Sequence, residues 1–164
     1  LKMLNEYFRT NMRNIELFYV TMFIGFYDVS TGELRCASAG HPYPFRYDFK
    51  NKMISELEMP GMPIGVTDNI EYPEYSLFLN ENDKLILYTD GLFDVRNGEA
   101  HDENYLDASV IKNFLECDGL INKKLDTIKR SLFDFLLAFN ESKDEFDDDI
   151  SVMLAHIKKI PEII

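Results

Sequence analysis

The chain has 164 residues, with 17 Lys and Arg against 29 Asp and Glu, so its formal net charge at pH 7 is −12. This acidity argues against nucleic acid as a partner, because phosphate backbones would be repelled from most of the surface. The composition, 46% hydrophobic and 28% charged, is typical of one globular domain over residues 1–164. No run approaches the roughly 18 consecutive apolar residues of a membrane span.

Cys36 and Cys117 lie among apolar neighbours and form no C-x-x-C motif. We interpret them as small buried hydrophobic residues in a reducing compartment, which predicts a cytoplasmic location. The chain starts at Leu1 instead of Met and no signal-peptide pattern follows, so we expect it to be a segment of a longer polypeptide.

The first half of the chain predicts one helix followed by two hairpins. Apolar residues at three- and four-residue steps predict a helix over 2–17. Residues 18–27 are aromatic and β-branched, and 33–39 alternate in polarity, so the two segments are expected to form a strand pair. Residues 45–49 and 53–57 predict a second hairpin.

The second half predicts further strands and two helices. Residues 58–67 contain two prolines and two glycines and predict a loop of fixed shape. Strands are expected at 75–79 and 84–89, on either side of a turn. Two helices then follow the irregular segment that ends near residue 105, and 150–157 is the last strand. The fold class is therefore α+β, with helices packed on a mostly antiparallel sheet.

Two acidic sites stand at the ends of predicted strands. Asp90 and Gly91 follow a continuous apolar strand, and a carboxylate at such an edge suits a hard cation such as Mg²⁺ or Mn²⁺. Asp147, Asp148 and Asp149 precede the last strand, and adjacent carboxylates repel one another unless water or a cation neutralises them. An ordinary Asp-Gly turn and a solvated acidic loop remain open alternatives.

Two other segments carry less specific signals. His41 lies in a turn without a second His or a Cys nearby, so it predicts neither a zinc site nor a nucleophilic triad. We expect it to have a structural role or to lie at the edge of a substrate site. The glycines of residues 61–65 lack the spacing of a nucleotide-binding loop and predict a shaped turn.

Several blocks are weak signals individually but specific in their order along the chain. They are FYVTMF (18–23), TGEL (31–34), ASAGHP (37–42), GMPIG (61–65), LYTDGLFD (87–94) and DDIS (148–151). In this order they resemble the SpoIIE/RsbU-type branch of the metal-dependent protein serine/threonine phosphatases, the PPM family. The resemblance extends over nearly the whole chain.

The resemblance implies an α-β-β-α sandwich of antiparallel sheets with a binuclear Mn²⁺ or Mg²⁺ centre. By the match, Asp90 and Asp148 would be ligands of the same metal, with Gly91, Asp149 and His41 at the edge of the site. A shift of one residue in the match would exchange Asp148 with Asp147 or Asp149. The implied reaction is hydrolysis of a phosphoprotein by a metal-bound water, with no side-chain nucleophile. The implied substrate is an anti-sigma-factor antagonist in bacterial stress signalling.

Family members also carry a Gly-Asp block and an Asp-x-x-Gly-x-Gly block before the region matched here, and residues 1–164 contain neither. We therefore expect the N-terminal strands and the metal-bridging carboxylate to be missing, and this fragment to be inactive alone. Exposed sheet edges would then favour a homodimer. Two alternatives remain open: a non-catalytic interaction module with the same fold, and an acidic domain that only binds divalent ions.

Overall fold

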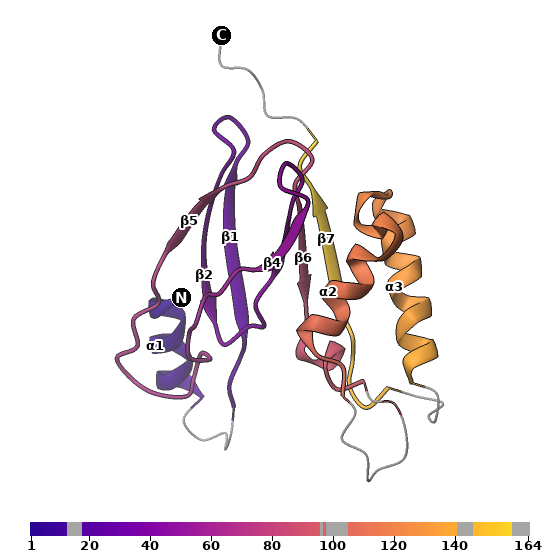
Figure 1. Cartoon of the computed structure of the whole chain (residues 1–164). Coiled ribbons are helices and arrows are strands. Elements are labelled where there is room, and N and C mark those ends of the chain that lie inside the picture. Colours follow the sequence, from indigo (N-terminus) through magenta and orange to yellow (C-terminus); the bar gives the residue numbers. More distant parts are fainter. Residues whose placement is uncertain (13–17, 96, 98–104, 141–145, 159–164) are drawn as a thin grey trace. The chain divides into compact units, whose positions relative to one another are not determined.

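The strands form two antiparallel sheets, one of three strands and one of four (Figure 1). The computed structural model describes residues 1–12, 18–95, 97, 105–140 and 146–158. Backbone contacts divide the chain into two units, each with one sheet. The first unit comprises Leu1–Tyr43 and Leu57–Asn82 with the residues from Ile157 on, and the second comprises Pro44–Glu56 and Asp83–His156.

The sheet of the first unit has the order β1-β2-β5. Its strands are β1 (Met22–Asp28), β2 (Glu33–Ala39) and β5 (Tyr75–Phe78). The expected pair of β1 and β2 is confirmed as an antiparallel hairpin. In its turn, the Asp28 carboxylate accepts hydrogen bonds from the backbone N–H of Ser30 at 2.8 Å and from the Ser30 hydroxyl at 2.6 Å. Gly32 follows with a φ of 76°, a conformation that favours glycine.

Strand β1 is shorter at its start than the sequence predicts. Val20 pairs with Ile64 in an isolated bridge, so the regular ladder begins only at Met22. Ile24 and Phe26, on one face of β1, are 53% and 61% exposed. The aromatic and β-branched composition therefore identified the strand, and this face of it is exposed.

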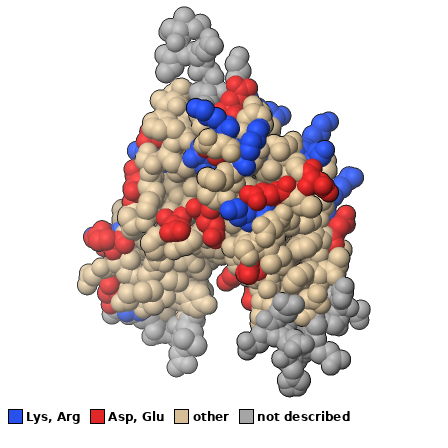
Figure 2. Space-filling view, viewed as in Figure 1, with Lys and Arg blue, Asp and Glu red and all other residues tan. Residues whose placement is uncertain are grey.

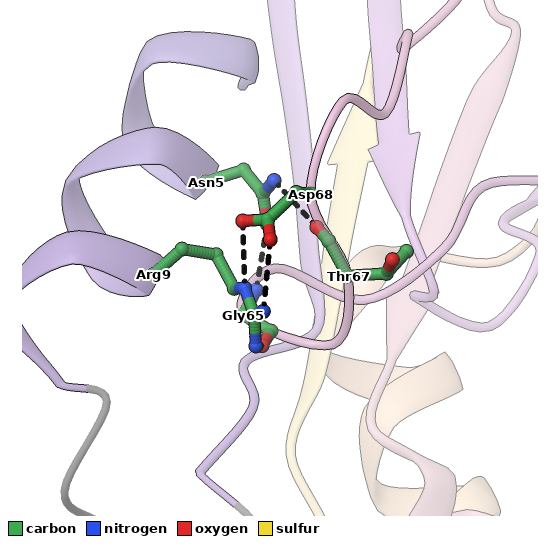
Figure 3. A network of polar contacts seen from close by, with 5 residues as sticks. All are labelled: Asn5, Arg9, Gly65, Thr67 and Asp68. Carbon is green, nitrogen blue, oxygen red and sulfur yellow. Dashed lines mark hydrogen bonds and ion pairs between the residues drawn. The ribbon is translucent and has the colours of Figure 1, made fainter.

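Helix α1 (Lys2–Asn11) is attached to the loop between β4 and β5 by a polar network (Figure 3). The side chain of Asn5 is buried, donates to the carbonyl of Thr67 at 3.0 Å and accepts from the N–H of Gly65 at 2.8 Å. Arg9 forms two hydrogen bonds with the carboxylate of Asp68, at 3.0 and 3.1 Å. The expected helix extended to residue 17; the structure ends it at Asn11, and residues 13–17 lie outside the described chain.

The sheet of the second unit has the order β4-β3-β6-β7. Its strands are β3 (Phe45–Asp48), β4 (Met53–Glu56), β6 (Lys84–Tyr88) and β7 (Val152–His156). The unit also contains helices α2 (Ala108–Glu116) and α3 (Leu125–Phe139) and the 3₁₀ segments η1 (Asp90–Leu92) and η2 (Cys117–Asn122). Helix α2 begins where the carboxylate of Asp107 accepts the N–H of Val110 at 2.9 Å, which satisfies one of the free donors of the first turn.

Helices α2 and α3 lie beside β6 and β7 and share a core with their sheet (Figure 1). Ile111 and Leu115 of α2 and Ile128 and Leu136 of α3 are at most 1% exposed. Burial of each such side chain contributes about 1.5–3 kcal/mol relative to exposure. This apolar contact holds the helices against the sheet that ends in the candidate site.

The two strands expected on either side of residues 80–83 belong to different sheets. β5 pairs with β2, whereas β6 pairs with β3 and β7. Asp83 is fully buried and accepts hydrogen bonds from the Arg46 guanidinium at 2.8 Å and from the Phe49 N–H at 3.0 Å. These bonds attach the start of β6 to the β3–β4 hairpin, a partnership that the local turn sequence does not encode. Among the described residues, no helix is long and apolar enough to cross a membrane.

Candidate metal centre

The pairing of β6 with β7 brings two distant acidic segments together. The strands are antiparallel, and Tyr88 at the end of β6 lies opposite Val152 at the start of β7. The residues just beyond each strand are therefore neighbours at one edge of the sheet. One segment holds Asp90, and the other holds Asp148 and Asp149.

Thr89 connects the two segments through its backbone and its hydroxyl. Its N–H donates to the carbonyl of Ser151 at 3.0 Å. Its hydroxyl donates to the carbonyl of Asp149 at 3.1 Å and accepts the N–H of Ser151 at 2.9 Å. Three hydrogen bonds thus join the residue before Asp90 to the backbone that follows Asp148.

Gly91 allows a backbone approach that a side chain would prevent. A Cβ atom at this position would lie 2.6 Å from the carbonyl oxygen of Asp149 and 3.4 Å from the Cβ of Asp148. Real Cβ atoms essentially never come closer than 3.0 Å to such an atom. The glycine after Asp90 is therefore a packing requirement of this edge.

The carboxylates at this edge suit a hard cation. Asp90, Asp148 and Asp149 are all exposed, so their oxygen atoms can reach a ligand. One oxygen of Asp148 accepts the N–H of Asp149 at 2.7 Å, which orients that carboxylate. Mg²⁺ and Mn²⁺ prefer oxygen ligands of this type. Within the described part of the chain, however, no group of three His, Cys, Asp or Glu residues could hold a metal ion, so the donor set there is partial.

The chain matches the family model of Stage II sporulation protein E (SpoIIE) over residues 1–158. It belongs to the SpoIIE family. Its relatives include the phosphoserine phosphatase RsbU of Bacillus subtilis, which is 23% identical over 140 residues covering 85% of this chain. The structure is similar to the SiaA-PP2C domain of Pseudomonas aeruginosa, with a TM-score of 0.72, 16% identity and 93% of this chain covered.

A third similar protein is the catalytic domain of the serine/threonine protein phosphatase PstP, solved with two manganese ions. It has a TM-score of 0.62 and 11% identity, and the match covers 96% of this chain and 66% of that one. The SpoIIE/RsbU-type resemblance and the α+β PP2C-type fold are thus confirmed. The chain spans 39% of the length of RsbU and 57% of the SiaA chain.

Two other predicted features of this SpoIIE-family chain, His41 and the 61–65 loop, lie in the first unit. His41 follows Gly40, which has a φ of 68°, and its ring lies 6.3 Å from that of Phe23. In the 61–65 loop, the N–H of Gly65 donates a hydrogen bond to the side-chain oxygen of Asn5. This bond agrees with the shaped turn that the sequence predicts. His41 and Asp90 lie in different units.

The two cysteines differ in environment. Cys36 is buried, with its sulfur 3.5 Å from that of Met59, and burial raises its pKa to about 11. Cys117 is exposed, so the expectation of a buried residue was wrong at this position. The 3₁₀ segment η2 starts at Cys117, directly after the last turn of α2. Both cysteines are free.

Thr89 and Ser151 belong to the sequence blocks 87–94 and 148–151 but are not among the predicted site residues. Their types gave no signal, since Thr and Ser are common beside acidic turns. Their role appears only when β6 is paired with β7, because the Thr89 hydroxyl then meets the backbone of residues 149 and 151.

Figure 2 shows acidic side chains in several separate groups on the visible face, with basic side chains among them. On this face, therefore, the acidic side chains are not confined to one place, and charge alone does not mark the candidate site. The site is identified by the adjoining strand ends.

Proposed function

We propose that this chain is part of a PPM-type protein serine/threonine phosphatase that uses Mn²⁺ or Mg²⁺ to hydrolyse a phosphoprotein. Asp90 and Asp148 would be ligands of one cation, with Gly91 and Asp149 as candidate residues at the edge of the site. One observation carries the proposal: in a SpoIIE-family chain, hydrogen bonds and a required glycine hold the Asp90 and Asp148 segments together. The manganese-bound PstP domain, which shares the fold, supports the choice of cation.

The chain's own residues would bind and orient. Asp90 and Asp148 supply oxygen ligands from two strand ends, and Thr89 fixes the distance between those ends. Gly91 has no side chain, and a Cβ at this position would push the two strand ends apart. A cation held there would lower the pKa of water and neutralise charge on the phosphoryl group. No side chain of this chain needs to act as a nucleophile.

The proposed substrate is a protein phosphorylated on serine or threonine. RsbU is named a phosphoserine phosphatase, which supports phosphoserine in particular. We propose an anti-sigma-factor antagonist type of substrate in bacterial signalling, and a cytoplasmic site of action.

Phosphate release by the full-length natural protein tests the proposal. With Mn²⁺ and a phosphoserine protein, the wild type is expected to release phosphate, and Asp90→Asn and Asp148→Asn are expected to lose at least about a hundredfold in kcat/KM. Asp134→Asn, an exposed aspartate on α3, is the matched control and is expected to retain activity. Mn²⁺ titration by calorimetry provides a second readout, in which both site variants bind more weakly. Full activity in Asp90→Asn would remove that residue from the site.

A second function is supported by the partial donor set. Among the described residues, no group of three His, Cys, Asp or Glu residues is placed so that it could hold a metal ion, which suits a non-catalytic interaction module with the PPM fold. The coding sequence upstream of Leu1 separates the two functions. A Gly-Asp block and an Asp-x-x-Gly-x-Gly block there would support the phosphatase, and their absence would support the interaction module.

A further inference from the structure

A hollow of about 400 Å³ adjoins the candidate metal centre within the second unit. Its lining residues are Phe133, Phe146, Asp148, Asp149 and Ile150. Asp148 and Asp149 therefore belong both to this hollow and to the acidic strand ends described above. A phosphorylated protein whose phosphoryl group reached Asp148 would bring its neighbouring residues over the hollow.

The apolar side of the hollow is built from two phenylalanines. Phe146 and Ile150 are partly buried and pack against the core of the unit, so they provide a fixed floor. Phe133, on α3, is 50% exposed. Its ring meets that of Phe146 edge to face, with the ring centroids 6.3 Å apart. A half-exposed aromatic ring beside a fixed aromatic floor offers contact area to an incoming apolar side chain.

The charge of the lining selects among occupants. Asp148 and Asp149 would repel an acidic side chain. An apolar side chain gains contact with the phenylalanines and needs no partner from the aspartates. An extended peptide advances about 3.3 Å per residue, so the side chain that enters would lie one or two residues from the phosphorylated one.

We propose that this hollow binds a large apolar side chain of the phosphoprotein substrate, next to the phosphorylated residue, and so determines substrate choice. The inference rests on the proposed function, since it takes the phosphoryl group to lie at Asp148. Phe133 is the selecting residue, because it forms the exposed wall. A basic occupant is the competing outcome, which the test includes.

The test compares peptides carrying the non-hydrolysable phosphonate analogue of phosphoserine. They differ only in having Leu, Ala or Lys one or two residues before or after that position. Affinity for the full-length protein with Mn²⁺ is measured by fluorescence anisotropy. In at least one position the Leu peptide is expected to bind about tenfold more tightly than the Ala peptide, as burial of one apolar side chain allows.

Variants assign the preference to the hollow. Phe133→Ala is expected to bring the Leu-to-Ala affinity ratio within about twofold of unity, and Phe133→Leu to retain an intermediate ratio. Phe78→Ala, which removes a ring that is 62% exposed in the first unit, is the matched control and is expected to keep the full ratio. Circular dichroism melts verify that each variant is folded.

The outcomes separate this inference from the proposed function. Equal affinities for the Leu and Ala peptides, tightest binding of the Lys peptide, or a preference that survives in Phe133→Ala would each overturn the inference. Phosphate release from ordinary phosphoserine peptides tests the reaction independently. Phosphate release without a preference for the Leu peptide would support the phosphatase function and contradict the role of the hollow. A Phe133-dependent preference without phosphate release would support the role of the hollow and contradict the phosphatase function.

Discussion

Replacing Gly91 with alanine is expected to destabilise the second unit and weaken Mn²⁺ binding together. The added Cβ would lie 2.6 Å from the carbonyl oxygen of Asp149 and 3.1 Å from its carbon. That oxygen belongs to the backbone and already accepts the Thr89 hydroxyl, so it cannot rotate away as a side chain could. The two segments must separate by about 0.4 Å for the contact to reach even 3.0 Å.

Two effects oppose each other in the free energy of unfolding. Forcing an extra methyl group into a packed site typically costs about 1–3 kcal/mol. Alanine also restricts the unfolded chain, which stabilises by about 0.4–1 kcal/mol where the native backbone suits it. Gly91 lies in the 3₁₀ segment η1 and is not among the positive-φ glycines, so this gain applies. Because the clashing atom is backbone, we expect the cost to dominate, with a net loss of about 1–2 kcal/mol.

Urea unfolding and Mn²⁺ calorimetry measure the two consequences. Gly25→Ala is the matched control, since the atoms nearest to its Cβ would belong to side chains: Leu34 Cδ1 and Phe23 Cε1, both at 3.2 Å. Its effect on stability is expected to stay within about 0.5 kcal/mol. Unfolding of Gly91→Ala at the same urea concentration as the wild type, together with unchanged Mn²⁺ affinity, would contradict the predicted backbone clash.

Three further predictions concern buried polar groups. Asn5→Ala is expected to cost about 1–3 kcal/mol, because a buried amide and its two hydrogen bonds to the loop are lost; an unchanged melting temperature would contradict this. Asp83→Ala removes the closer of the two carboxylates that face the Arg46 guanidinium and leaves only Asp48, at 3.9 Å, so about 3 kcal/mol is expected, with a smaller loss in Asp83→Asn; urea midpoints measure both. Burial raises the pKa of Cys36 to about 11, so at pH 8 only about one thiol in a thousand is ionised. Iodoacetamide is therefore expected to label exposed Cys117 first, and equal labelling by mass spectrometry would refute the assignment.

Local patterns predicted elements better than partners. The strand at 33–39 and the hairpin at 45–56 follow from alternation and turn residues, which act between near neighbours in the chain. The extent of α1 and of β1 was overestimated, because apolar periodicity continues past the point where regular hydrogen bonding ends or begins. The sheet change at Asp83 depends on its bonds to Arg46 and Phe49, more than 30 residues away along the chain.

For the candidate site, too, the sequence predicted the residues and the tertiary structure determined their partners. The order of the motifs identified the SpoIIE-type family, and the residue types marked Asp90, Gly91 and Asp148, because ligand chemistry and backbone freedom are properties of single residues. That Asp90 and Asp148 share one edge depends on the register of β6 against β7, which places Tyr88 opposite Val152. Only the tertiary structure revealed that Thr89 bonds the two segments, that Gly91 is required by contact with Asp149, and that Phe133 walls a neighbouring hollow. The physical reason is that the contacts of Thr89 and Gly91 join residues more than 50 positions apart, and their energies depend on a register that neither segment encodes alone.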